Sequence, residues 1–393
     1  MANASSGTPT GTPAVRRGGV SSERNKPALR GGETIATFSA AAPVGAAGAH
    51  PNFIFHGGPV VNCAQVYSSF WGAAWQSDPE HKTLVGRLNQ YLTDLVASKF
   101  MNVLHQYGVN GGTFVRGTFV GGIAASLTDK DIHTVIQSLI DSGGLPEPTN
   151  PTNTITLMIY LDDSTSVNDP AGTGIVMCAA AGDDAFGYHS FFTTKAGNPF
   201  YYAVMPGLSD ACLKASCSSD AGCSLHLAET REQRLTQVTS HEFAELVTDP
   251  QLNAWFEGNA SGENGDICNG ETAALTVGPN TWTVQRTYSK TDDINTNGAS
   301  FCLSEAPNPI PPLSPGPGGA VAMLTPGLPT GQVHPLLPLP SVLFDAKSKQ
   351  VSLSDEEVWA FVDRAFLPLR ARHITNDLPA LLTQIAASLG RRK

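Results

Sequence analysis

The stretch SHEFAELVTDP brings His241, Glu242 and Glu245 together in an otherwise largely apolar segment. Helical periodicity predicts one helix over 229–247, so His241 and Glu245 lie one turn apart on the same face, about 5–6 Å between their Cβ atoms. That face continues from Val238 and therefore points inward. Burying three ionisable side chains costs several kcal/mol unless something compensates them. A bound metal ion would do so, and so would a closed set of salt bridges.

The spacing of these residues suits metal chemistry. Two ligands at i and i+4 can hold one ion while Glu242, beside the first ligand, holds a water. This is the arrangement of the H-E-x-x-H zinc proteases with glutamate in place of the second histidine. A third ligand usually comes from a later segment, and ENGDIC offers Glu263 and Asp266. We therefore predict a divalent cation, zinc or a similar ion, on His241 and Glu245.

Two alternatives to a transition-metal site are compatible with the same residues. His241 and Glu245 are satisfied without any ion if Arg231, Arg234 or backbone groups pair with them. A calcium site is the second alternative, because the region is rich in hard oxygen ligands, namely Asp249, Glu257, Glu263 and Asp266. Histidine is a poor calcium ligand, which favours a transition metal for the helix.

The elements around the motif predict an α/β or α+β fold with a mixed sheet. Apolar residues at helical spacing predict helices over 83–107 and from 128 to 142. Runs of β-branched and aromatic residues predict strands before, between and after them, at 60–72, 154–161, 174–180, 187–192 and 200–206. The motif helix follows the strands, so we expect it to pack on the sheet.

Charge is distributed unevenly along the chain. The net charge is −10 over 393 residues, but residues 51–340 alone carry 11 basic and 26 acidic side chains. A core this acidic repels phosphate backbones, so we expect no nucleic-acid partner. No run of 18 apolar residues exists, so we expect no membrane-spanning helix.

Composition divides the chain into four segments. Residues 1–50, rich in small residues with scattered arginines, predict a disordered basic arm, and residues 51–305 a metal-binding core. Residues 306–340 contain 11 prolines and no charged side chain, which indicates an extended linker. Residues 341–393 complete the chain.

The last segment, 341–393, predicts two short amphipathic helices. Ser354 can cap the first helix with Glu357 at its third position, and Asp377 can open the second. Two such helices cannot bury themselves alone. We expect them to dock on the core or to mediate self-association.

Seven cysteines give one cue to localisation and the N-terminus gives another. Crowding of five cysteines between 212 and 302 favours disulfides and an oxidising compartment. Cys268 and Cys302 are a reasonable pair, and Cys212, Cys217 and Cys223 read as loop staples rather than a zinc knuckle. The first 30 residues contain no apolar stretch typical of a conventional signal peptide.

Several longer motifs resemble the EXORDIUM-like, phosphate-induced protein family of plants and its microbial relatives. They are FHGGPV, QVYSSFWG, LVASKFMNVLHQYGV, GYHSFF and SHEFAELVTDPQLNAWFEGNASGENGDICNG. The resemblance spans about residues 52–302. It implies an extracellular protein linked to the cell wall, with a zincin-like core.

Carried over residue by residue, the resemblance implies metal ligands at His241, Glu245 and Glu263, with Asp266 orienting a ligand. Glu242 becomes the general base of a zinc hydrolase that acts on a peptide or cell-wall-type substrate. His189 in GYHSFF would polarise the substrate carbonyl, although a core histidine on a strand fits equally well. The alternative function is a non-catalytic secreted binding protein, whose HEFAE cluster is a structural metal or ion-pair site.

Overall fold

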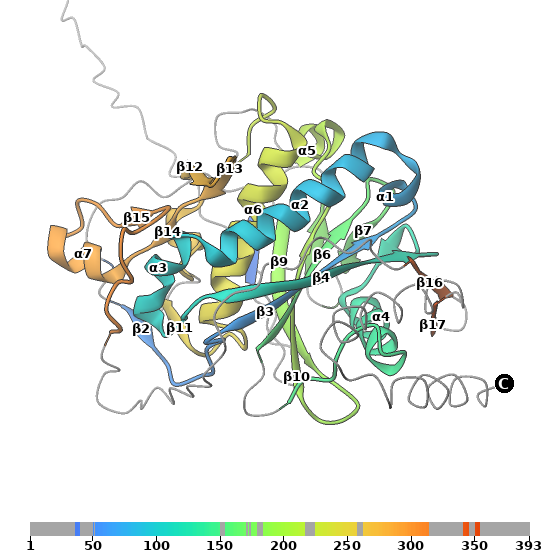
Figure 1. The fold of residues 1–393 in the computed structure, drawn as a ribbon, viewed down its shortest axis with the longest axis horizontal. Coiled ribbons are helices and arrows are strands. Elements are labelled where there is room, and N and C mark those ends of the chain that lie inside the picture. The colour runs from blue at the N-terminus through green and yellow to red at the C-terminus, as the bar shows by residue number, and fades with distance from the viewer. Residues whose placement is uncertain are drawn as a thin grey trace, which may run out of the picture.

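The computed structural model describes residues 36–39, 50, 52–149, 154–169, 172, 174–178, 184–216, 225–257, 262–313, 341–345 and 350–353. They form the α/β structure that the sequence predicts: a large mixed sheet with helices on both faces (Figure 1). Among the described helices, none combines the length and apolar composition needed to cross a bilayer.

The centre of the sheet is parallel, and antiparallel pairs lie on both sides of it. Its parallel strands run in the order β4 (Gly112–Gly121), β3 (Ala64–Trp71), β6 (Ile155–Leu161) and β10 (Pro199–Met205). Strand β9 (Asp184–Thr193) then pairs antiparallel with β10. Further strands extend both sides: β8 (Ile175–Met177), β7 (Ser166–Asp169) and β5 (Ser126–Leu127) beyond β9, and β16 (Ser341–Asp345) and β17 (Gln350–Leu353) beyond β4.

Helices cover the two faces of this sheet with separate cores. Helices α2 (Pro79–Ala97) and α6 (Arg231–Thr248) share one core, and α4 (Asp129–Asp141) belongs to the other (Figure 1). Side chains of β6 alternate between these cores, as a strand buried on both faces requires. The other helices in the described part of the chain are α1 (Ala74–Ser77), α3 (Phe100–Leu104), α5 (Asp210–Ser216), α7 (Lys290–Thr296) and two 3-10 turns at His105–Tyr107 and Asp266–Cys268.

Small two-stranded ribbons complete the fold beside α6. They pair β2 (Phe53–Phe55) with β11 (Trp255–Glu257), β12 (Thr272–Val277) with β13 (Asn280–Gln285), and β14 (Thr287–Tyr288) with β15 (Cys302–Leu303). Strand β13 packs along α6, where Thr236 donates a hydrogen bond to the Thr283 carbonyl at 2.7 Å.

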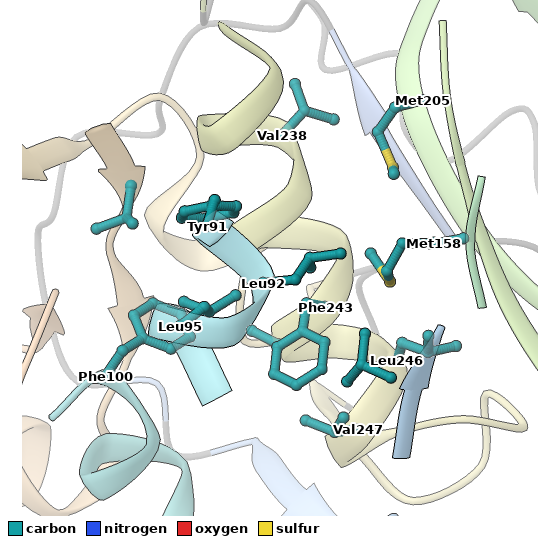
Figure 2. Packing of buried hydrophobic residues seen from close by; sticks show 14 of the residues in the cluster. Tyr91, Leu92, Leu95, Phe100, Met158, Met205, Val238, Phe243, Leu246 and Val247 are labelled. Atoms are coloured by element: carbon teal, nitrogen blue, oxygen red, sulfur yellow. The ribbon is translucent and has the colours of Figure 1, made fainter. Parts of the chain in front are cut away.

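Helix α6 is fixed at both ends and along its length. It begins with a capping box, in which Thr230 and Gln233 satisfy each other's backbone N–H groups. Its apolar side chains pack against α2 and the sheet strands, as Figure 2 shows for Val238, Phe243, Leu246 and Val247. Phe243 is fully buried, so replacing it with alanine should cost about 3–5 kcal/mol of stability. This rigid packing is what holds the ionisable residues of α6 in place.

Towards both ends of the chain, the structure contains strands that the sequence did not predict. The arm predicted as disordered over 1–50 contains strand β1 (Ala36–Ser39), which pairs with β9. Residues 341–353, which precede the helix predicted to begin at Ser354, contain the hairpin β16–β17, which extends the sheet next to β4. Strands whose partners lie far away along the chain, as Ala36 does from His189 and Ser341 from Phe119, leave little local signal. The predicted helices after Ser354 and Asp377 lie outside the described residues.

The start of the predicted linker is bound to the core. Backbone N–H groups of Ala306, Ile310 and Leu313 donate to carbonyls of Lys99, Asn102 and Gln106, respectively. The non-proline residues between the prolines supply these donors, so the segment 306–313 follows α3. The remainder of the linker, 314–340, lies outside the described residues.

Two disulfides are present in the described part of the chain. The predicted bridge Cys268–Cys302 is confirmed, and Cys178–Cys212 is a second one. Because Cys212 forms a disulfide, it does not join the other cysteines as a metal ligand. Cys217 and Cys223 lie outside the described residues.

Candidate metal centre

Helix α6 presents three of the predicted site residues to the sheet. His241 is 1% exposed, and Glu242 and Glu245 are fully buried. The i, i+4 spacing brings the Nε2 atom of His241 to 3.1 Å from Oε1 of Glu245. The structure therefore places the motif inside the protein, where the charges must be compensated.

His189 reaches the same place from strand β9. Its Nδ1 lies 3.6 Å from Oε2 of Glu242 and 3.4 Å from Oε2 of Glu245, and its Nε2 lies 3.6 Å from Oε1 of Glu263. The approach is close because residue 187 is glycine: a Cβ there would lie 2.8 Å from the Oε1 atom of Glu242. His189 is thus a member of the cluster and not an isolated core histidine.

The loop after α6 delivers the two downstream carboxylates. Asp266 donates its backbone N–H to Oε1 of Glu245 at 3.1 Å and places Oδ1 3.8 Å from Nε2 of His241. Its side chain is 25% exposed, whereas Glu263 is buried. Gly265 lies against the ring of His241, and a Cβ there would come within 2.9 Å of Nδ1.

This loop is tied to the rest of the fold on both sides. Asn264 donates a side-chain hydrogen bond to the Thr248 hydroxyl at 2.9 Å and accepts one from the Tyr288 backbone. The Cys268–Cys302 disulfide closes the segment immediately afterwards. The loop therefore holds its carboxylates against α6 without depending on their charges.

Gln285 of β13 completes the cluster and is not among the predicted site residues. Its amide nitrogen lies 2.7 Å from Nδ1 of His241 and donates to the Gly265 carbonyl, while its oxygen accepts from the Gly270 N–H. These contacts fix the plane of the His241 ring. Only the position of Gln285 on a ribbon that packs along α6 reveals this role, and the residue type carries no signal of its own.

Spacing within the cluster suits shared ion ligands better than direct hydrogen bonds. Charge-assisted hydrogen bonds are typically about 2.7–2.9 Å long, but four of the five imidazole–carboxylate separations described above are 3.4–3.8 Å. Two ligands at about 2.0–2.2 Å from one tetrahedral ion stand ~3.4 Å apart. In the described part of the structure, both ring nitrogens of His189 and Oε2 of Glu245 make no hydrogen bond.

Among the described residues, two sets of ligand atoms have the compactness that an ion needs, and they share Glu245. One set is His241, Glu245 and Asp266, and the other is His189, Glu242 and Glu245; within each set all ligand atoms lie within 4.8 Å of one another. The predicted ligands His241 and Glu245 are therefore brought together with Asp266, which the resemblance gave the role of orienting a ligand. Glu263 faces His189 instead.

Charge and burial act in opposite directions on the pKa values of Glu242 and Glu245. Burial raises the pKa of both, but the nearby His241 and His189 hold the pKa of Glu245 at about 2. At Glu242 burial outweighs the histidines, so its pKa is raised. Glu245 therefore stays ionised to lower pH than Glu242 does.

At the two histidines, burial lowers the pKa and the nearby carboxylates raise it. Burial lowers the pKa of His189, but Glu263, Glu242 and Glu245 together hold it well above its ordinary value. Glu245 and its neighbours likewise raise the pKa of His241 to about 9 against burial. The amide nitrogen of Gln285 opposes protonation at Nδ1, but one dipole is weaker than several charges.

Each alternative to a transition metal on α6 keeps some of its proposed partners and loses others: the Asp266 N–H pairs with Glu245, and Glu263 and Asp266 lie in the cluster. Arg231 pairs with Glu80 and Asp163, and Arg234 with Asp210 and backbone carbonyls. Of the calcium candidates, Asp249 accepts two backbone N–H groups after α6, and Glu257 pairs with His50. These residues are engaged at other places in the fold.

Comparison with known proteins gives one relevant similarity. The chain is 26% identical over 245 residues to Protein EXORDIUM-like 3 of Arabidopsis thaliana, a match that covers 55% of this chain and 68% of that protein. No protein-family model matches the chain, and no solved structure matches it. The similarity supports the resemblance to the EXORDIUM-like family that the motifs indicate.

Proposed function

We propose that this chain is a metal-dependent hydrolase of the EXORDIUM-like family that cleaves peptides, with zinc as its ion. His241, Glu245 and Asp266 would hold the ion. The observation that supports this most directly is that Nε2 of His241 lies 3.1 Å from Oε1 of Glu245 and 3.8 Å from Oδ1 of Asp266, in a set whose ligand atoms all lie within 4.8 Å of one another. When bound, the ion supplies Lewis acidity towards a substrate carbonyl and a water.

The choice between the two ligand sets follows from charge and access. Both nitrogens of His189 face carboxylates, so its imidazolium is already the counter-ion of the second set. The first set includes Asp266, whose partly exposed side chain connects it to solvent. With His189 protonated and His241 neutral, the six clustered side chains carry a net charge of −3 (four carboxylates and one imidazolium), which a divalent cation reduces.

Glu242 is the general base in this proposal. Its raised pKa lets the carboxylate take a proton from the attacking water and pass it to the amine that leaves as the C–N bond breaks. His189, whose Nδ1 lies 3.6 Å from the same carboxylate, would keep Glu242 oriented as its counter-ion. A net −2 from Glu245 and Asp266 weakens the ion's Lewis acidity, so we expect slow turnover.

Two disulfides and the similarity to an EXORDIUM-like protein support an extracellular location for the chain. We therefore propose peptide substrates of the kind present outside the cell or in the cell wall. Self-association through the C-terminal segment remains part of the proposal.

A non-catalytic binding protein is the second candidate, and one observation favours it. His189, Glu242 and Glu245 are all fully buried, so an imidazolium closing on the carboxylates could serve simply to hold α6, β9 and the following loop together. In this case an ion, if bound, stabilises the fold and reacts with nothing.

Replacing Glu242 with glutamine tests the catalytic proposal against the structural one. The amide keeps the shape but cannot accept the proton, so turnover of a peptide library should fall about 10²–10⁴-fold. Metal content, measured on the same protein, should stay the same. Turnover that is unchanged in Glu242→Gln, or absent from the parent protein with its metal bound, would overturn catalysis at this site.

A further inference from the structure

Strand β9, which carries His189, has partner strands on both of its edges. At His189 one edge pairs with Ala203 of β10, and the other pairs antiparallel with Ala36 of β1. Strand β10 continues through β6 into the parallel centre of the sheet. Strand β1 has only four residues, and among the described strands it pairs with β9 alone. It is an addition to the sheet and not part of its framework.

The register places β1 along the part of β9 that contacts the candidate centre. Thr37 stands opposite Tyr188, and Phe38 opposite Gly187, the glycine that lets β9 approach Glu242. The pairing shifts register immediately after Phe38, so the ladder is interrupted. A short, interrupted ladder is held by few backbone hydrogen bonds and can be displaced.

We propose that this edge of β9 is a binding site for extended peptides and that β1 is its resident occupant. An exposed strand edge recognises a peptide through its backbone N–H and C=O groups, which a glycan does not offer. The arm therefore competes with peptide ligands for the edge beside His189 and Glu242. As a statement about substrate this rests on the proposed function, but the binding itself does not require turnover.

The arm has properties that suit a tethered competitor. Residues 1–50 carry five basic and two acidic side chains, whereas residues 51–340 carry 26 acidic and 11 basic ones. Opposite charge favours the docked arm, and covalent attachment gives it an effective concentration of the order of mM. A peptide in solution must displace it to bind.

Thr37→Pro in the full-length chain tests this proposal, because proline removes a backbone donor in the middle of β1. Thr10→Pro, in the same arm but outside β1, is the control. Both are made in the Glu242→Gln background, so the probe is not cleaved and the outcome does not depend on catalysis. The probe is a fluorescent peptide with the sequence of residues 33–42, ETIATFSAAA.

If the arm occupies the edge in nine molecules of ten, Thr37→Pro should tighten peptide binding about tenfold relative to Thr10→Pro. Hydrogen exchange in residues 184–193 should become faster in Thr37→Pro and slow again when the peptide binds. Equal peptide affinity in the two variants, or unchanged exchange in this strand, would overturn the proposal. Because peptide binding is measured in the Glu242→Gln background, failure of the proposed hydrolase activity would not change the interpretation of this binding experiment.

Discussion

Tyr188 and His189 are neighbours in β9 and face opposite sides of the sheet, where each joins a buried polar cluster. On the α4 side, Tyr188 and Tyr202 both donate to Oδ1 of Asp129 at 2.7 Å. His133 lies 3.1 Å from the other oxygen of Asp129. One carboxylate thus has three close partners at ordinary hydrogen-bond lengths.

The cluster on the α6 side is built differently. It gathers four carboxylates and two imidazoles, with most separations too long for strong hydrogen bonds. A closed network such as that around Asp129 stabilises a fold, because each polar group is satisfied. An expanded, anionic network costs stability unless a cation completes it. The comparison shows that burial alone does not distinguish a candidate ion site from a structural polar cluster. The distances between the polar atoms and the balance of their charges distinguish the two.

We expect the largest difference between the two clusters when the carboxylate shared by both ligand sets is removed. Glu245→Ala deletes the carboxylate common to both ligand sets, so zinc should no longer copurify and peptide turnover should be lost. Asp129→Ala should lower the free energy of unfolding by about 1–3 kcal/mol, because it leaves buried hydroxyls unpaired, and should keep the metal. Elemental analysis and urea unfolding of both variants measure this. Metal retained in Glu245→Ala would contradict the assignment of ligands.

Gln285 should have a smaller, graded effect. Gln285→Leu removes the amide that orients the His241 ring, so zinc affinity should fall about 10–100-fold, as for other residues that orient metal ligands. Competition with a fluorescent chelator measures the affinity. Gln65→Leu, which removes an exposed amide bonded to Thr154, is the matched control. Equal affinities in the two variants would remove Gln285 from the site.

The smallest effect we expect is on the pH dependence of stability after chelation. The pKa of His241 is raised from 6.5 to about 9 in the folded protein, so its stabilisation is complete below pH 6.5 and is lost as pH rises towards 9. The pKa of Glu245 is lowered from 4.5 to about 2, so its stabilisation is lost as pH falls below 4.5.

Urea unfolding of chelator-treated full-length protein should therefore give a maximum of stability between about pH 4.5 and 6.5. Bound zinc should flatten the alkaline side, because the ion takes the place of the proton on His241. Stability that rises from pH 6.5 to 9 after chelation would show that the carboxylates do not hold a charged imidazole.

Local sequence predicted the parts of this molecule that depend on local physics. Helix α6 follows from its periodicity and capping residues, and the spacing of His241 and Glu245 follows from helix geometry. Glu263 and Asp266 were identifiable because few residue types bind cations. Gln285 was not, because its role depends on how β13 packs on α6. Strand β1 and the hairpin β16–β17 were missed for a similar reason: their partners lie far away along the chain.

The central claim is that an imidazole and acidic oxygens of this cluster share one divalent cation, and metal content tests it most directly. Protein purified without added metal should contain about one zinc per chain. His241→Ala should lose that zinc, while His133→Ala, which removes a histidine from the closed network on the other face of the sheet, should keep it. Two results would contradict the account. One is a parent protein that contains no metal and is as stable as the same protein with zinc bound, and the other is a His241→Ala variant that retains its zinc.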